Sequence, residues 1–162
     1  QHFLTDQSYA QKIAKSLTRT NYNAVLEIGP GTGVLTQFLL ERKFETHVIE
    51  VDVESIDYLK VHLPKLGNRI IHADFLRWSM EDYFTDQVAI IGNFPYNISS
   101  QIVFKTLEKR HLVPEFAGMF QLEVAKRICA GPGSKTYGIL SVLTQAFYNT
   151  HYLFDVPPAV FY

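Results

Sequence analysis

The sequence predicts an α/β fold in which helices cover both faces of a mostly parallel sheet. Short apolar runs typical of buried strands alternate along the chain with segments whose apolar residues recur at helical spacing. A glycine-rich turn at residues 29–33 joins the first apolar run to the helix expected after it. The 162 residues, of which 47% are hydrophobic, suffice for a core but only for one ordinary domain. We therefore expect a single domain over residues 1–162.

The expected elements follow a strand–helix order. Asp6 is the expected N-cap of a first helix, in which Tyr9, Ile13 and Leu17 share one face. Further helices are expected at residues 35–39, 55–63, 98–107 and 139–147. Strands are expected at residues 24–28, 46–51, 69–73, 87–91, 116–120 and 152–156. Right-handed crossovers place ligands at the carboxyl ends of parallel strands. The candidate site therefore comprises the loops at residues 29–33, 50–52, 74–76 and 92–97.

The composition excludes several classes of protein. Charged residues make up only 19% of the chain, which argues against disorder, and the longest apolar runs are too short to cross a bilayer. Residues 1–6 carry no basic flank or apolar stretch, so no secretory signal is expected there. The single cysteine, Cys129, excludes an intramolecular disulfide, and the histidines show no metal-ligand spacing. We expect a cytoplasmic protein that has no membrane span and no metal.

Glycines and acids stand at the ends of three expected strands. Gly29, Gly31 and Gly33 lie between a strand and a helix, where they let the backbone turn sharply and let a ligand approach it. Glu50 ends the second strand, where a carboxylate can accept hydrogen bonds from both hydroxyls of a ribose. Asp74 ends the third strand, where it can accept the exocyclic amine of an adenine. Each feature alone fits a tight turn or a solvated acid, but together they describe a pocket for an adenosine-bearing cofactor.

The four residues after the fourth strand, Asn93-Phe94-Pro95-Tyr96, point to chemistry on a planar amine. The amide oxygen of Asn93 can accept one N–H of such an amine, and the backbone carbonyl before or at Pro95 can accept the other. Both bonds orient a poorly nucleophilic lone pair toward an electrophile, so catalysis needs no strong base. Tyr96 or Phe94 can stack on a flipped base.

These motifs resemble those of the ribosomal RNA adenine N6,N6-dimethyltransferase family, of the small-subunit (KsgA) type. The resemblance covers nearly all of the chain. The matching stretches are QHFL at residues 1–4, EIGPGTG at 27–33, VIEVD at 48–52, HADF at 72–75, GNFPYNIS at 92–99, QLEVAKR at 121–127, YGILSV at 137–142 and VPPAVF at 156–161.

The resemblance implies a class I, Rossmann-like fold that binds S-adenosyl-L-methionine. It implies dimethylation of N6 in each of two adjacent adenines in a 3′-terminal hairpin of small-subunit (16S) rRNA. The substrate would be a pre-ribosomal 30S particle, and we expect a monomer. The implied cofactor-binding residues are His2, Leu4, Gly29, Gly31, Glu50, Asp74, Phe75 and Asn93. Asn93 would also hold the target amine, and Pro95 and Tyr96 would complete its pocket.

The sequence departs from the family pattern in two ways. Phe94 stands where leucine is common in the family, and an apolar side chain there is expected to keep the role. Family members also begin a few basic residues before the position of Gln1, and they continue past that of Tyr162 with a further strand and a small helical domain. We therefore expect the catalytic domain here without its C-terminal helical domain.

Basic side chains outnumber acidic ones in residues 98–135. We expect contacts with rRNA phosphates from Lys105, Lys109, Arg110, Lys126 and Arg127; the alternative is an ordinary solvated helix face.

Two alternative functions of the protein stay open. One is a large-subunit rRNA adenine methyltransferase of the antibiotic-resistance type, and the other is a non-catalytic RNA-binding assembly factor. The glycine spacing and the Asn93 segment disfavour a nicotinamide-dependent oxidoreductase.

Overall fold

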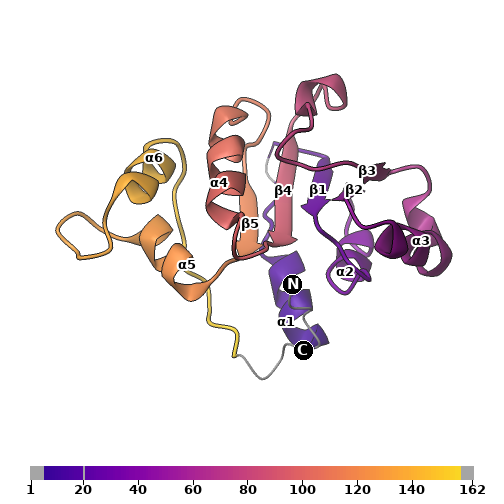
Figure 1. Cartoon of the computed structure of the whole chain (residues 1–162), viewed down its shortest axis with the longest axis horizontal. Helices are drawn as coiled ribbons and strands as arrows, with labels where there is room; N and C mark the ends of the chain where they lie inside the picture. The colour runs from indigo at the N-terminus through magenta and orange to yellow at the C-terminus, as the bar shows by residue number, and fades with distance from the viewer. Residues whose placement is uncertain (1–5, 20, 158–162) are drawn as a thin grey trace.

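A single parallel sheet organises the chain (Figure 1). The computed structural model describes residues 6–19 and 21–157. Five strands pair in the order β3-β2-β1-β4-β5, and every pairing is parallel. The strands are β1 (Ala24–Ile28), β2 (Glu45–Glu50), β3 (Ile70–His72), β4 (Val88–Asn93) and β5 (Phe116–Met119). The order reverses at β1, so the loops after β1 and β4 flank a topological switch point.

Helices connect the strands. They are α1 (Gln7–Lys15), α2 (Thr36–Leu40), α3 (Val53–His62), α4 (Ser99–Glu108), α5 (Leu122–Cys129) and α6 (Ile139–Phe147), with short 3₁₀ turns at Pro64–Leu66 and Met80–Asp82. Asp6 caps α1, as expected, because its Oδ1 accepts the Ser8 N–H at 2.8 Å. These elements confirm the predicted α/β fold class.

The two faces of the sheet carry different helices because strand residues point alternately to either side. On one face, Val25 and Ile91 belong to a buried cluster with residues of α1 and α2. On the other face, Leu26 and Ile90 pack with Ile102 of α4. Beside α4, at the β5 end of the sheet, α5 and α6 form a further helical layer (Figure 1).

The strand expected at residues 152–156 is wrong. Residues 151–157 form no strand and donate or accept no backbone ladder hydrogen bond within the described part of the chain. This segment packs through a side chain instead, because the Phe154 ring lies 6.1 Å from that of Tyr9 on α1. Its alternating apolar residues indicated a strand, but an apolar side chain can be half-buried against a helix without strand pairing.

The helix α5 was not among the expected helices. It follows β5 directly, and its buried Ile128 packs against α4 and α6. The apolar spacing of Val124, Ile128 and Cys129 was visible in the sequence. Eight residues carry too few apolar repeats for that spacing alone to define a helix.

Two glycines that face each other across β4 and β5 make room for a buried ring. Gly92 pairs with Gly118, and the Phe94 ring lies against both of them. A Cβ at Gly118 would overlap this ring, and one at Gly92 would lie 2.7 Å from the Ile28 carbonyl oxygen. Phe94 is only 1% exposed, so its ring has little space into which to move.

We expect Gly118→Ala to lower the free energy of unfolding by about 1–3 kcal/mol, because the added methyl group overpacks the Phe94 ring. Urea denaturation measures this difference. Gly131→Ala is the matched control: a Cβ there would meet nothing within 4 Å, so its effect should stay within about 0.5 kcal/mol. Equal denaturation midpoints for the two variants would contradict this account of the packing.

Candidate active site at the carboxyl edge of the sheet

Backbone hydrogen bonds extend beyond the ends of the strands and bring the predicted loops together. The Gly29 N–H donates to the Ile49 carbonyl at 2.9 Å, and the Ala73 N–H donates to the Glu50 carbonyl at 3.2 Å. Ile28 is in register with Gly92, which places the glycine turn beside the segment that follows β4. The carboxyl ends of four strands therefore form one continuous edge.

The glycine turn depends on backbone conformations that favour glycine. Gly29, Gly31 and Gly33 have φ angles of 67°, 57° and 86°. The turn closes when the Gly33 N–H donates to the Pro30 carbonyl at 2.9 Å. The helix after it, α2, has five residues, as expected, but starts one residue later, at Thr36. The glycine backbone, rather than a long helix, is therefore what this loop presents to a ligand.

Glu50 is buried and is oriented by backbone donors. Its Oε1 accepts the Gly31 N–H at 3.0 Å, and its Oε2 accepts the N–H groups of Val51 and Asp52 at 2.9 and 3.1 Å. Its exposed fraction is 7%. A carboxylate offers about four lone-pair sites, so the three backbone donors leave about one site, on Oε1, for a hydroxyl donor. Glu50 thus ties the end of β2 to the glycine turn.

A second buried acid, Glu27, lies behind the glycine turn and was missed as a site residue. It is 2% exposed, and the Thr36 hydroxyl donates a hydrogen bond to its Oε1. Burial raises the pKa of Glu27 to about 8; the Thr36 hydrogen bond opposes that rise, and the nearby Glu50 charge adds to it. The signal was an acid inside an apolar strand immediately before a glycine turn.

Glu27 is expected to make the stability of the chain depend on pH. The folded state favours its protonated form up to about pH 8, whereas the unfolded chain ionises it above its ordinary pKa of 4.5. Its contribution is therefore complete below pH 4.5 and is lost as pH rises toward 8.

Between about pH 5 and pH 8, the free energy of unfolding of the wild type should fall by an amount on the order of 1–4 kcal/mol because of Glu27. Glu27→Gln cannot ionise, so we expect this fall to be absent in the variant. Urea denaturation at the two pH values measures it. The exposed Glu41→Gln serves as control. A wild-type pH dependence retained by Glu27→Gln would contradict the assignment.

Asp74, predicted to bind the adenine, and Phe75, predicted to bind the cofactor, lie in different environments. The Asp74 side chain is 48% exposed, and its Oδ1 accepts the Leu76 N–H at 3.0 Å. Phe75 is 4% exposed and packs in the core below the sheet edge. Asp74 can therefore offer a carboxylate to a ligand, whereas Phe75 can offer only its backbone.

The Asn93–Tyr96 segment leaves the sheet at the end of β4 and enters α4. Asn93 is the last residue of β4, in register with Met119. The Pro95 carbonyl accepts the Ile98 N–H at 3.2 Å, which closes a turn. Tyr96 is 49% exposed at the start of this turn region. The segment therefore presents one half-buried amide and one exposed aromatic ring beside the glycine turn.

Phe94 cannot stack on a flipped base, so that part of the expectation is wrong. Its ring is 1% exposed and lies 5.0 Å from the Phe120 ring, centroid to centroid. Sequence alone does not distinguish Phe94 from Tyr96 for this role. The structure distinguishes them, because Gly92 and Gly118 have no side chains and the Phe94 ring packs in the core against both of them. Tyr96 remains the candidate for stacking.

The sequence pattern of the ribosomal RNA adenine dimethylase family matches residues 1–162. This chain belongs to that family. A ribosomal RNA small subunit methyltransferase A from Flavobacterium johnsoniae is 61% identical to this chain over an alignment that covers 99% of this chain. The chain spans only 62% of the length of that relative. The predicted resemblance is therefore confirmed at the level of the family.

Solved structures agree with the family assignment. A dimethyladenosine transferase from Plasmodium falciparum superposes with a TM-score of 0.75 at 29% identity, covering 88% of this chain and 52% of that one. The 23S rRNA methyltransferase ErmE gives a TM-score of 0.69 at 30% identity, covering 81% of this chain and 52% of its own. The predicted class I methyltransferase fold is confirmed.

Three of the basic side chains predicted to bind RNA make contacts within the chain itself. The Lys105 ammonium donates to the carbonyls of Phe75 and Trp78. Lys109 forms an ion pair of 2.8 Å with Glu81, which raises the pKa of the lysine. The Arg110 guanidinium lies 3.9 Å from the centroid of the Phe147 ring. These contacts depend on the tertiary structure, so a count of charges along the sequence could not find them.

The other two predicted RNA contacts are exposed. Lys126 and Arg127 lie in the last turn of α5, and neither forms an ion pair within the described ranges.

Two of the predicted cofactor-binding residues, His2 and Leu4, lie outside the described residues. In residues 6–19 and 21–157, no three His, Cys, Asp or Glu side chains gather as a metal site. No helix in that part of the chain is long and apolar enough to span a membrane.

Proposed function

We propose that residues 1–162 form the S-adenosyl-L-methionine-binding catalytic domain of an rRNA adenine N6,N6-dimethyltransferase. The substrate would be two adjacent adenines in a 3′-terminal hairpin of 16S rRNA, presented within a pre-ribosomal 30S particle. One observation carries this proposal: the glycine turn held by Glu50 and the Asn93–Tyr96 segment lie on the same edge of the sheet. We further propose that the chain acts as a monomer in the cytoplasm.

The residues at this edge fit the cofactor. Its ribose hydroxyls need an acceptor, which the Glu50 carboxylate supplies in a fixed orientation. Its adenine amine needs an acceptor at the end of β3, where the Asp74 carboxylate is half-exposed. Its amino-acid end needs close access to backbone, which Gly29 and Gly31 allow because they carry no side chain. When bound, the cofactor supplies an electrophilic methyl group.

The chain's own residues would orient the target amine. The Asn93 amide oxygen would accept one N–H of the adenine amine, and a backbone carbonyl would accept the other. The Pro95 carbonyl already accepts the Ile98 N–H, so the Phe94 carbonyl is the better second acceptor. Two fixed acceptors hold the nitrogen lone pair toward the methyl donor, and this positioning replaces a general base.

The exposed Tyr96 ring would hold the plane of the target base. A base that leaves its stack loses favourable contacts, and an aromatic side chain restores part of them at about 1–3 kcal/mol per base. Tyr96 lies three residues after Asn93 in the segment that joins β4 to α4. This proximity lets one short segment both stack the base and bind its amine.

The degree of similarity favours the small ribosomal subunit. The relative named for the small subunit is 61% identical to this chain, whereas the 23S rRNA methyltransferase ErmE is 30% identical. Both would share the cofactor edge, so the difference in substrate must come from surfaces that contact RNA. Lys126 and Arg127, which are exposed on α5, are candidates for such a surface.

The proposal is tested by incubating the chain and tritium-labelled S-adenosyl-L-methionine with unmethylated small and large ribosomal subunits. The Flavobacterium relative serves as the positive control. Label in small-subunit rRNA alone is the expected result. Label in the large subunit would favour the antibiotic-resistance type, and cofactor binding by calorimetry without label in either subunit would favour a non-catalytic RNA-binding module.

A further inference from the structure

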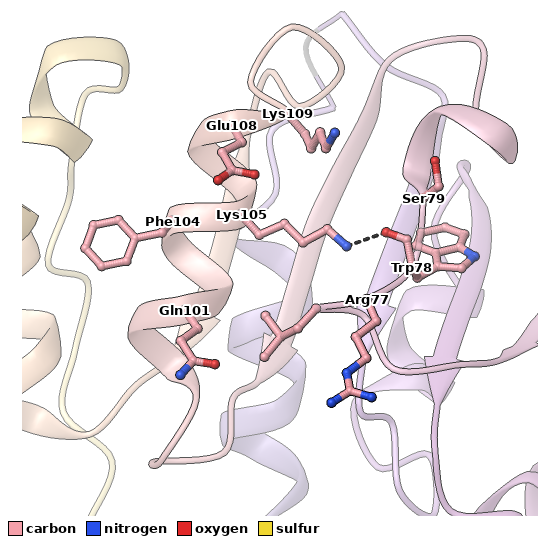
Figure 2. A pocket seen from close by; sticks show the side chains of 9 residues that line it. Arg77, Trp78, Ser79, Gln101, Phe104, Lys105, Glu108 and Lys109 are labelled. Atoms are coloured by element: carbon pink, nitrogen blue, oxygen red, sulfur yellow. Dashed lines mark hydrogen bonds between the residues drawn. The ribbon is translucent and has the colours of Figure 1, made fainter.

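A groove of about 520 Å³ lies between the loop after β3 and the exposed side of α4 (Figure 2). Its loop side includes Arg77 and Trp78, and its helix side includes Phe104 and Lys105. In Figure 2 the Lys105 side chain reaches from α4 across the groove to the backbone of the loop. The basic groups here suggest an anion site, but the contacts of Lys105 give it another role.

The Lys105 ammonium is used by the protein itself. It donates hydrogen bonds to the carbonyl oxygens of both Phe75 and Trp78. It also lies 4.6 Å from the centroid of the Phe75 ring, where a cation is attracted by the π electrons. An ammonium has three donors, so two of the three are directed at the loop. Little of its hydrogen-bonding capacity remains for a phosphate.

The loop that Lys105 holds is the one that orients Asp74. The Leu76 N–H donates to the Asp74 carboxylate at 3.0 Å, and the Arg77 N–H donates to the Asp74 carbonyl at 3.0 Å. The carbonyls that Lys105 binds belong to the residues just after Asp74 and just after Arg77. A shift of this turn would therefore rotate the Asp74 carboxylate away from its present direction.

The helix that carries Lys105 also begins at the target-amine segment. Ser99, the first residue of α4, donates its hydroxyl to the Tyr96 carbonyl at 3.3 Å. Lys105 lies less than two turns further along the same helix. Lys105 is thus one link between the helix that follows the Asn93 segment and the loop that follows β3, beside the Lys109–Glu81 ion pair.

We infer that Lys105 is a positioning residue, which fixes the Asp74 turn against α4 and so sets the adenine end of the cofactor site. This inference rests on the proposed function, because it assumes that Asp74 faces the cofactor. It also explains why a lysine within a basic stretch faces the protein backbone rather than solvent. Its role is indirect, since it acts through the carbonyls of the turn.

The single tryptophan allows the turn to be observed directly. Trp78 is the one tryptophan of the 162 residues, and its carbonyl is a partner of Lys105. Lys105→Met keeps the length of the aliphatic stem and removes the ammonium. We expect it to weaken S-adenosyl-L-methionine binding by about tenfold. We also expect a lower Trp78 fluorescence anisotropy even without cofactor, because the turn gains freedom.

Two further variants separate positioning from general effects. Lys105→Arg retains a cation with several donors, so it should restore most of the affinity and the anisotropy. Lys60→Met removes an exposed lysine on α3 and should change neither. If Lys105→Met does not fold by circular dichroism, Lys105→Gln, whose neutral side chain is too short to bridge to both carbonyls, is measured in its place with the same expectations.

Each outcome of these measurements decides one statement. Wild-type affinity and wild-type anisotropy in Lys105→Met would overturn the positioning role while leaving the proposed function intact. A lower anisotropy with unchanged affinity would also overturn it, because the turn would then not set the cofactor site. Failure of the wild-type chain to bind S-adenosyl-L-methionine would overturn the proposed function, and with it this inference.

Discussion

Asn93→Ala is expected to lower the rate of methyl transfer to rRNA about a thousandfold, because the variant loses an oriented acceptor that acts on the reacting nitrogen. The affinity for S-adenosyl-L-methionine should change by no more than about threefold, since Asn93 is only one of the implied cofactor contacts and the carboxylates that would bind the adenosine lie on other strands. Single-turnover transfer of labelled methyl measures the rate, and calorimetry measures the affinity. The variant is expected to fold, because Asn93 stands at the end of β4 rather than in its buried centre.

The matched control for this prediction is Asn97→Ala. Asn97 is an exposed residue of the turn that follows Tyr96, and it should retain transfer within about threefold. A retained rate in Asn93→Ala would contradict the proposed role of the amide oxygen. An equal loss in both variants would show that the turn itself, rather than Asn93, determines the rate.

Glu50→Gln is expected to weaken S-adenosyl-L-methionine binding about a hundredfold, because hydrogen bonds to a charged acceptor are each worth about 1.5–3 kcal/mol. The substitution has two consequences at once. The neutral amide is a weaker acceptor for ribose hydroxyls, and its NH₂ group meets the backbone N–H groups of Gly31, Val51 or Asp52. Isothermal titration of the cofactor into the variant measures the change.

The control for Glu50 is Glu54→Gln. Glu54 is exposed in the first turn of α3, a few residues after Glu50, and carries the same charge. We expect its affinity to stay within about twofold of wild type. Cofactor affinity that is equally reduced in both variants would indicate a long-range charge effect, and unchanged affinity in Glu50→Gln would contradict the ribose assignment.

The fold was predictable because its signals are local. Each strand of the sheet contains consecutive apolar residues, and the glycines at residues 29–33 mark the turn after the first strand. The strand expected at residues 152–156 shows the limit of such signals. A half-buried apolar segment looks the same in sequence whether its partner is a strand or, as here, helix α1.

The candidate site was predictable at the ends of strands and unpredictable where it depends on packing. Glu50 and Asn93 stand where parallel strands place ligands. The burial of the Phe94 ring depends on two glycines that lie 26 positions apart in sequence and face each other across β4 and β5. No local pattern reports that contact.

The intramolecular contacts of the basic side chains also depend on packing. Lys105 and Lys109 appear in the sequence as two cations on one helix face, and the structure gives each a partner from the segment after β3. Their contacts bring together residues about thirty positions apart in the chain. A basic stretch therefore indicates where RNA contacts can occur, and the tertiary structure decides which side chains remain available for them.

The most direct test of this account is mass spectrometry of the nuclease fragments of 16S rRNA, which reports both the modification and its position, after unmethylated small subunits react with the chain and S-adenosyl-L-methionine. The account predicts N6,N6-dimethyladenosine at two adjacent adenines of the 3′-terminal hairpin, and its absence with Asn93→Ala. Methylation at another atom or another nucleotide would contradict it, as would dimethyladenosine formed equally well by Asn93→Ala.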